Sequence, residues 1–189
     1  MTRIAEFARV QLGQSQHERA QRLCDEHPPY AGSHRGEAAM QVGFLGEIVV
    51  RDFLDDVGVG YDAVFTTQHD LVVHGCGRAE VKTKDRTVVP KPLYECSVPL
   101  YNHEHQDVDY YVFVSLLRER NDSMAIERFH TAFIVGACNR RMLDQHSVEW
   151  QAGQTDPANG TKFWTSCRNI AITNLLPIDD AAARWRARQ

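Results

Sequence analysis

Residues Gln68–Lys84 read QHDLVVHGCGRAEVKTK, and this stretch predicts a β-hairpin. Leu71–Val73 is a short apolar run suited to a first strand, and the residues after it include two glycines that favour a tight connection. Ala79–Thr83 then forms the second strand. Because side chains alternate across a strand, Glu80 and Lys82 project from the same face.

The hairpin also predicts where Asp70 lies. If the turn centres on Cys76, Asp70 pairs with Lys82 across the hairpin. Asp70 then shares a face with Glu80 on the diagonal, where Cα atoms are about 7–8 Å apart. Two carboxylates directed at one point can hold a hard divalent cation. Lys82 beside them supplies positive charge where a phosphate or an attacking water would lie.

An aspartate followed ten residues later by Glu-x-Lys resembles the motif of the PD-(D/E)XK nuclease superfamily. Asp70, Glu80 and Lys82 carry the resemblance. Glu47, in the segment GFLGEIVVRDFL, resembles the acidic residue that many members have on the helix before the hairpin. The residue before Asp70 is His69, where the motif has proline.

This resemblance implies a metal-dependent DNA nuclease, a phosphodiesterase with Mg²⁺ or Mn²⁺ as its cofactor. Asp70 and Glu80 would bind the ion together with the Val81 carbonyl, and Glu47 would bind directly, through water or at a second ion. The ion would polarise the scissile phosphate and lower the pKa of a bound water. Lys82 would position that water or help to deprotonate it. Endonuclease and exonuclease activity both remain open.

Further residues are candidates for contacts with DNA. Lys84 shares a face with Lys82 further along the strand, and neighbouring basic side chains could contact phosphates. Aromatic and amide side chains after residue 93 could touch the nucleic-acid backbone or stack on a base, or the tyrosines could pack on the sheet. The predicted nucleic-acid contacts are Lys84, Arg86, Lys91, Tyr101 and Asn102.

Structural alternatives exist for the charged residues. Glu80 and Lys82 could form an ion pair on a solvated strand, although exposed ion pairs contribute only about 0–1 kcal/mol to stability. Glu47 could pair with Arg51, four residues later on the same helix.

Two other function classes remain open. A nuclease-like domain could bind nucleic acid or protein without cutting, because folds outlast their chemistry. A zinc hydrolase could use His103 and His105, whose spacing would place both imidazoles on one side of a strand.

Composition sets the broad class. Apolar residues make up 43% of the chain and charged residues 24%, as in ordinary globular proteins. The net charge is −4, yet residues 78–91 carry five basic and two acidic side chains, a local charge of +3. The five cysteines contain no CxxC pair, which favours reduced thiols. No segment approaches the ~20 apolar residues of a membrane span, and the N-terminus lacks the apolar core of a signal peptide.

These observations predict a cytoplasmic protein with DNA as its partner, no membrane contact and no organic cofactor. A small nuclease of this kind would suit a phage. A homodimer is also a candidate state, because cleavage of two strands in this superfamily often involves a dimer.

The predicted fold class is α/β: a restriction-endonuclease-like αβββαβ core, with a mixed central sheet flanked by helices, plus an N-terminal helix. One domain over residues 1–189 would comprise an N-terminal helical arm and loop (1–36), a catalytic core (37–117) and additional strands with a C-terminal helix (118–189). The resemblance itself covers residues 41–116. Predicted helices span 2–24, 37–56, 136–145 and 180–188, and predicted strands outside the hairpin span 61–67, 109–117, 128–135 and 168–178.

Overall fold

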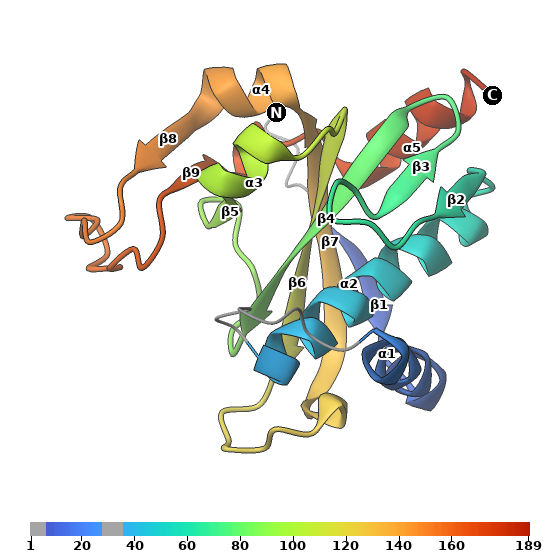
Figure 1. The fold of residues 1–189 in the computed structure, drawn as a ribbon, viewed down its shortest axis with the longest axis horizontal. Coiled ribbons are helices and arrows are strands. Elements are labelled where there is room, and N and C mark those ends of the chain that lie inside the picture. The colour runs from blue at the N-terminus through green and yellow to red at the C-terminus, as the bar shows by residue number, and fades with distance from the viewer. Residues whose placement is uncertain (1–6, 28–35) are drawn as a thin grey trace.

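The computed structural model describes residues 7–27 and 36–189 and has mixed α/β architecture (Figure 1). Its helices are α1 (Gln14–Glu26), α2 (Gly36–Asp56), α3 (Leu100–His105), α4 (Arg140–His146) and α5 (Ile178–Arg186). Its strands are β1 (Ala8–Gln11), β2 (Tyr61–Ala63), β3 (Leu71–Val73), β4 (Gly77–Arg86), β5 (Glu95–Pro99), β6 (Tyr110–Arg118), β7 (Phe129–Asn139), β8 (Ser147–Trp150) and β9 (Cys167–Ala171).

The central sheet has six strands in the order β1-β7-β6-β4-β3-β2. Strands β4 and β6 are parallel, and the other neighbouring pairs are antiparallel, so the sheet is mixed as the sequence predicts. After α2 the chain forms the β2-β3-β4 meander and then crosses through β5 and α3 to β6. A parallel pair requires such a crossover, because a tight turn can join only antiparallel neighbours.

Both faces of the central sheet are covered. β6 is buried over most of its length, which confirms the expectation that its apolar sequence forms a central strand. One hydrophobic core cluster packs α2 and α5 against one face of the central sheet. A second cluster packs α4, β5 and β9 against the opposite face. Among the residues that the structure describes, no helix has the length and apolar character needed to cross a membrane.

A second sheet, in the order β5-β9-β8, extends to one side of the central sheet (Figure 1). The sequence did not predict β8, and it left residues 93–105, which contain β5, as either a helix broken by Pro99 or an extended segment. Both strands are short, with 5 and 4 residues. β5 alternates between buried and half-buried residues, but over too few residues to decide between strand and helix, and β8 is largely exposed. Their pairing with β9 is a long-range contact that local sequence does not encode.

The predicted N-terminal helix is wrong over residues 7–13. Ala8–Gln11 forms β1, which pairs with β7 at the edge of the sheet, and α1 begins only after Gly13. The edge of β7 offers unpaired backbone groups to this segment, and satisfying them overrides the local helical pattern. The first part of the predicted helix and most of the predicted loop that follows α1 lie outside the described residues.

Other boundaries shift because tertiary pairing decides where each strand ends. The first strand of the meander, β2, stops at Ala63 because β3 is only three residues long. β7 continues through Asn139, into the predicted helix 136–145. The last predicted strand is shorter than expected, since β9 ends at Ala171.

Helix α2 confirms its prediction, and one glycine sets how closely it packs on β4. A Cβ atom at Gly46 would lie 1.9 Å from Oγ1 of Thr83, a distance that no packed structure tolerates. The helix backbone therefore rests directly on the β4 side chain. Glu47, the next residue, takes its position from this contact.

We expect Gly46→Ala to push α2 away from β4 and to lower the free energy of unfolding by about 1–3 kcal/mol through overpacking. Gly43→Ala is the matched control, because a Cβ there meets no atom within 4 Å. The control should raise stability by about 0.5–1 kcal/mol, since alanine is the better helix former. Urea denaturation of both variants measures the difference, and equal stabilities would contradict the close contact.

Candidate active site

The candidate site lies where β4 continues beyond its neighbour β3. The two strands pair only over Leu71–Val73 and Gly77–Ala79, whereas β4 extends to Arg86. The pairing Val73↔Gly77 centres the turn on Gly75, which adopts φ of 71°. The expected turn centre at Cys76 is therefore wrong.

This register excludes the expected pairing of Asp70 with Lys82, because Leu71 already lies opposite Ala79. Asp70 precedes β3, and its backbone N–H donates to the carbonyl of Ala79 at 3.1 Å. The Asp70 carboxyl lies close enough to Glu80 for the Glu80 charge to raise its pKa.

The Asp70 side chain takes over the backbone pairing that β3 no longer provides. Its Oδ2 accepts a hydrogen bond from the backbone N–H of Val81 at 2.8 Å. The N–H and C=O groups of a residue in an extended strand point to the same side. The Val81 carbonyl is therefore directed toward the side of β4 on which Asp70 lies.

Glu80 and Lys82 form an ion pair that is largely shielded from solvent. Lys82 Nζ lies 2.7 Å from Oε1 of Glu80, and their side chains are 16% and 8% exposed. Gln106 completes the cluster: its Nε2 donates to Glu80 Oε1 at 2.8 Å and its Oε1 accepts from Lys82 Nζ at 3.3 Å. The structural alternative predicted an ion pair on a solvated strand. The ion pair is present, but it is largely shielded from solvent.

The sequence did not predict a role for Gln106. It follows α3 in the crossover, and its backbone carbonyl accepts a hydrogen bond from Arg140 Nη1 at 2.9 Å. The same guanidinium donates through Nη2 to the carbonyl of His103 at 2.7 Å, so α4 fixes the end of α3. A lone glutamine in a connecting segment carries no local pattern that would have identified it.

Glu47 reaches the site region from α2 and pairs with Arg51. Arg51 Nη2 donates to Glu47 Oε2 at 2.9 Å, and both side chains are nearly buried. Burial raises the pKa of Glu47 to about 7; the Arg51 charge opposes this shift, and the charge of Glu80 adds to it. The Glu47–Arg51 pair, which was predicted as the structural alternative for Glu47, is therefore present. The Glu47 carboxyl group also interacts electrostatically with Glu80.

Asp70 also has a strongly perturbed acidity. Burial raises its pKa well above the usual value, and the charges of Glu47 and Glu80 raise it further. The hydrogen bond from Val81 and the charge of Lys82 act in the opposite direction without cancelling the increase. Three carboxyl groups from α2, the start of β3 and β4 therefore influence one another at one place.

The oxygen atoms at the site are suitable ligands for a hard divalent cation, but the number of acidic side chains that could bind it is small. Within residues 7–27 and 36–189, no group of three or more His, Cys, Asp or Glu side chains is arranged to hold a metal ion. The smaller set of Asp70, Glu80 and the Val81 carbonyl supplies only oxygen atoms, which Mg²⁺ and Mn²⁺ prefer. Mutual repulsion between the carboxylates is what a dication would relieve.

The structural premise of the zinc alternative is wrong. His103 and His105 lie on helix α3, where residues two apart point in different directions, instead of on a strand. His103 contacts the Tyr111 hydroxyl at 3.2 Å and Asp144 at 3.0 Å. His105 contacts the carbonyl of Tyr101 at 2.9 Å, so the two imidazoles have separate partners.

A groove of about 1710 Å³ runs along β4 from Val81 to Arg86, and its lining also includes the start of α2 and residues 121–124. Among the predicted nucleic-acid contacts, Lys84, Arg86 and Asn102 line it. Tyr101, 70% exposed, stacks on His105, and the exposed Lys91 lies outside the lining of the groove. The structure therefore brings three of the five predicted contacts to one surface.

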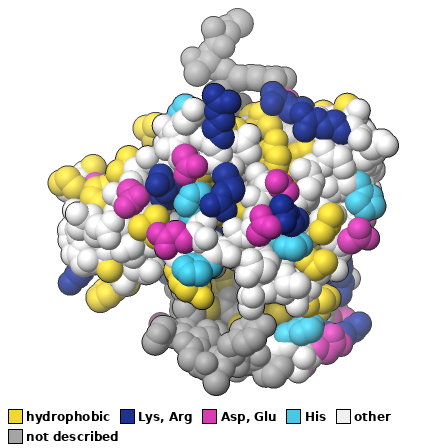
Figure 2. All heavy atoms as spheres, turned by 45° about the horizontal axis from the view of Figure 1, so that its top comes forward, with side chains coloured by type: hydrophobic (Ala, Val, Ile, Leu, Met, Phe, Trp, Pro, Cys, Tyr) yellow, Lys and Arg dark blue, Asp and Glu magenta, His cyan; other side chains and the backbone are white. Residues whose placement is uncertain are grey.

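The distribution of surface charge agrees with the small net charge. On the face shown in Figure 2, Lys and Arg side chains lie among Asp, Glu and His side chains instead of forming one continuous basic patch. Comparisons of the chain with protein families, curated proteins and solved structures found no match. The interpretation of the site therefore depends on its own geometry and chemistry.

The raised pKa of Glu47 predicts how stability changes with pH. A carboxyl group whose pKa is higher in the folded than in the unfolded state binds more protons when folded, so the free energy of unfolding falls as pH rises from about 4.5 to about 7. We expect Glu47→Gln to reduce this loss of stability across that range. Urea denaturation at several pH values measures it, with Glu18→Gln on the exposed face of α1 as the control. An unchanged pH dependence in Glu47→Gln would contradict the burial argument.

Proposed function

We propose that this protein is a metal-dependent DNA nuclease with a PD-(D/E)XK-type site. The observation that carries the proposal is the convergence of Asp70, Glu80 and Lys82 at the open edge of β4, with Asp70 bonded to the Val81 N–H. If β5 of the second sheet is set aside as an insertion between β4 and α3, the element order α2-β2-β3-β4-α3-β6 follows the αβββαβ order of the restriction-endonuclease-like class, which supports that finer assignment.

Under this proposal Asp70, Glu80 and the Val81 carbonyl would hold Mg²⁺ or Mn²⁺, with Glu47 contributing from α2. When bound, such an ion would polarise a phosphate and make a water molecule more acidic. The protein would supply the remaining requirements. Two buried carboxylates would orient the ligands, and the ammonium group of Lys82 would stabilise negative charge developing on the phosphate.

Gln106 would act as a positioning residue. Its amide contacts both Glu80 and Lys82, so it holds the ammonium group and the carboxylate in one arrangement. Arg140 fixes the backbone of Gln106 in turn. An amide that bonds both partners limits the rotamers of two long side chains, which otherwise lose conformational entropy when they are ordered.

We expect Lys82→Ala to reduce DNA cleavage by about 10²–10⁴-fold, the range for loss of a group that acts in the transition state. The fold should persist, because Glu80 keeps its hydrogen bond from Gln106, and circular dichroism and the unfolding transition check this. The assay uses linear, circular, single-stranded and branched DNA with Mg²⁺ or Mn²⁺. Cleavage at the wild-type rate by Lys82→Ala would refute the role of this residue.

Metal binding separates a nuclease from a domain that keeps the fold without cutting. Calorimetric titration with Mn²⁺ should show binding that weakens by at least about tenfold in Asp70→Asn and in Glu80→Gln. Both amides keep an oxygen that can accept the existing hydrogen bonds. Asp62→Asn is the control, because its side chain is 72% exposed and pairs with His74. Absence of Mn²⁺ binding that depends on Asp70 and Glu80 would favour the non-cutting domain.

A further inference from the structure

The groove along β4 is too large for a small ligand. Its volume of about 1710 Å³ exceeds the range of about 300–1,000 Å³ that is typical of small-molecule sites. It lies between the central sheet and the β5-β9-β8 sheet, and the segment between β8 and β9 contributes part of its wall. A segment of a polymer therefore fits this volume better than a single small molecule.

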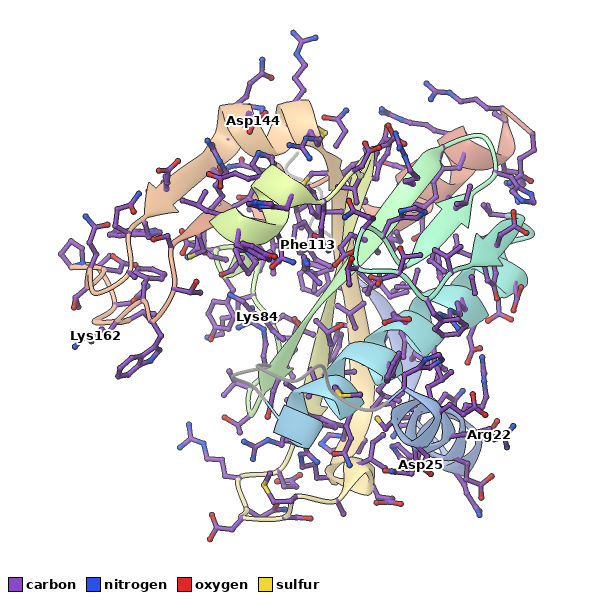
Figure 3. All side chains as sticks on the ribbon, in the orientation of Figure 1. Arg22, Asp25, Lys84, Phe113, Asp144 and Lys162 are labelled. Carbon is purple, nitrogen blue, oxygen red and sulfur yellow. The ribbon has the colours of Figure 1, made fainter. Side chains whose placement is uncertain are left out.

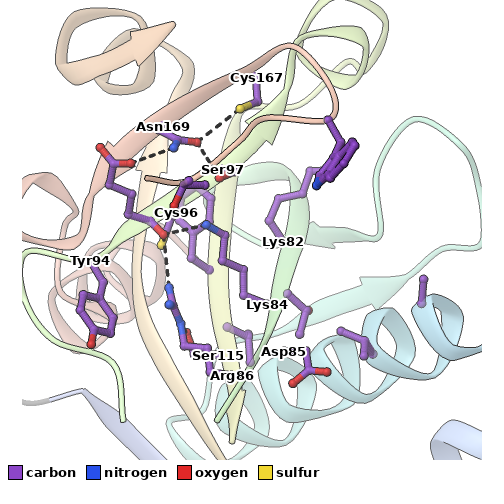
Figure 4. A pocket seen from close by; sticks show the side chains of 18 of the residues that line it. Lys82, Lys84, Asp85, Arg86, Tyr94, Cys96, Ser97, Ser115, Cys167 and Asn169 are labelled. Carbon is purple, nitrogen blue, oxygen red and sulfur yellow. Dashed lines mark hydrogen bonds between the residues drawn. The ribbon is translucent and has the colours of Figure 1, made fainter. Parts of the chain in front are cut away.

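The floor of the groove carries basic side chains without acidic partners. Lys84 Nζ donates to the carbonyl of Glu95 at 2.9 Å, and Arg86 Nη2 donates to the same carbonyl at 3.2 Å (Figure 4). Within residues 7–27 and 36–189, neither side chain forms an ion pair with a carboxylate. Burial lowers the pKa of both groups, because each positive charge is partly removed from water.

These cations form a row with the candidate site. Lys82, Lys84 and Arg86 alternate along one face of β4, so successive Cα atoms lie about 6–7 Å apart. A polyanion that follows β4 would therefore meet a positive charge at regular intervals, starting at the proposed catalytic lysine.

Three of the four acidic side chains that line the groove have partners within the protein, and the fourth, Asp122, is exposed. Asp85 pairs with Arg118 at 2.8 Å, and Glu95 accepts a hydrogen bond from Asn169 at 2.8 Å. Asp156 is buried and accepts from the backbone N–H of Ala158 and the side chain of Asn159. Lys84 and Arg86 on β4 are the basic side chains of the floor without a carboxylate partner, and they are complementary to phosphates.

The wall of the groove carries an exposed aromatic side chain. Trp164 is 85% exposed, and Lys162 lies with its Nζ 5.3 Å from the centre of the indole ring. Both residues line the groove, and Lys162 lies at the tip of the segment that joins β8 to β9 (Figure 3). An exposed indole beside an ammonium group is suited to stacking on a base while the cation contacts a phosphate.

We infer that the groove binds a single strand of DNA, with its phosphates along Lys84 and Arg86 and a base stacked on Trp164. This inference rests on the proposed nuclease function and names the form of the substrate. A single strand exposes the faces of its bases to an aromatic side chain, whereas a duplex hides them within its stack. The single strand would lead directly to Lys82 at the end of the groove.

Fluorescence anisotropy in EDTA tests the inference without cleavage, using a labelled 20-nucleotide oligothymidine and a duplex of the same length. We expect Trp164→Ala to weaken binding of the single strand by about 5- to 150-fold, as for loss of one stacked base, and to affect the duplex less than about twofold. Trp164→Phe should restore most of the affinity, since it retains an aromatic face.

Salt dependence tests separately the phosphate contact that the Lys162 ammonium group would make beside Trp164. Lys162→Ala should make the slope of log K against log salt less steep by about 0.7 for the single strand. Arg22→Ala is the matched control, because Arg22 is an exposed cation on α1 at the opposite side of the molecule from Lys162 (Figure 3). The control should leave the slope unchanged.

The outcomes separate this inference from the proposed nuclease activity. Binding of the single strand that depends on Trp164 supports the groove even if cleavage is absent, in which case the proposed activity alone is wrong. Two results would overturn the inference that the groove binds a single strand, even if Lys82-dependent cleavage is observed. One is preferential binding of the duplex, and the other is equal binding of the single strand by wild type and Trp164→Ala.

Discussion

The hydrogen bond from the Val81 N–H to the Asp70 carboxylate, 2.8 Å long, is the contact on which the rest of the candidate site depends. It occurs where β3 has ended and β4 continues, so a side chain satisfies a backbone donor that a strand would otherwise satisfy. The bond draws Asp70 against β4 beside Glu80, where burial and neighbouring charges raise its pKa. Through this contact the Asp70 carboxyl group joins those of Glu47 and Glu80.

Stability alone gives little reason to build such a cluster. Glu47–Arg51 and Glu80–Lys82 are ion pairs with little exposed surface, and Asp70 adds a third carboxyl group to them. Removing charges from water is costly, and replacing buried ion pairs with apolar residues is often neutral or stabilising. Perturbed carboxyl groups close to a cation and a groove are instead the features expected of a functional site.

The β5-β9-β8 sheet gives the site its surroundings. It provides the carbonyl of Glu95 that holds Lys84 and Arg86, and the segment before β9 carries Trp164. The crossover from β4 to β6 passes through β5 of this sheet and then through Gln106, whose side chain contacts Glu80 and Lys82. One excursion of the chain thus shapes both the proposed catalytic cluster and the groove leading to it.

Local sequence determined the elements whose patterns are self-contained: the amphipathic α2 with Glu47, the apolar β6, and the alternation that places Glu80 and Lys82 on one face. Tertiary structure decided what depends on partners distant in the chain. The turn centre moved because glycine conformations and cross-strand bonds set the register, and residues 8–11 became a strand because β7 had an unpaired edge. Gln106 joined the site through contacts with residues more than twenty positions away, which no local periodicity records.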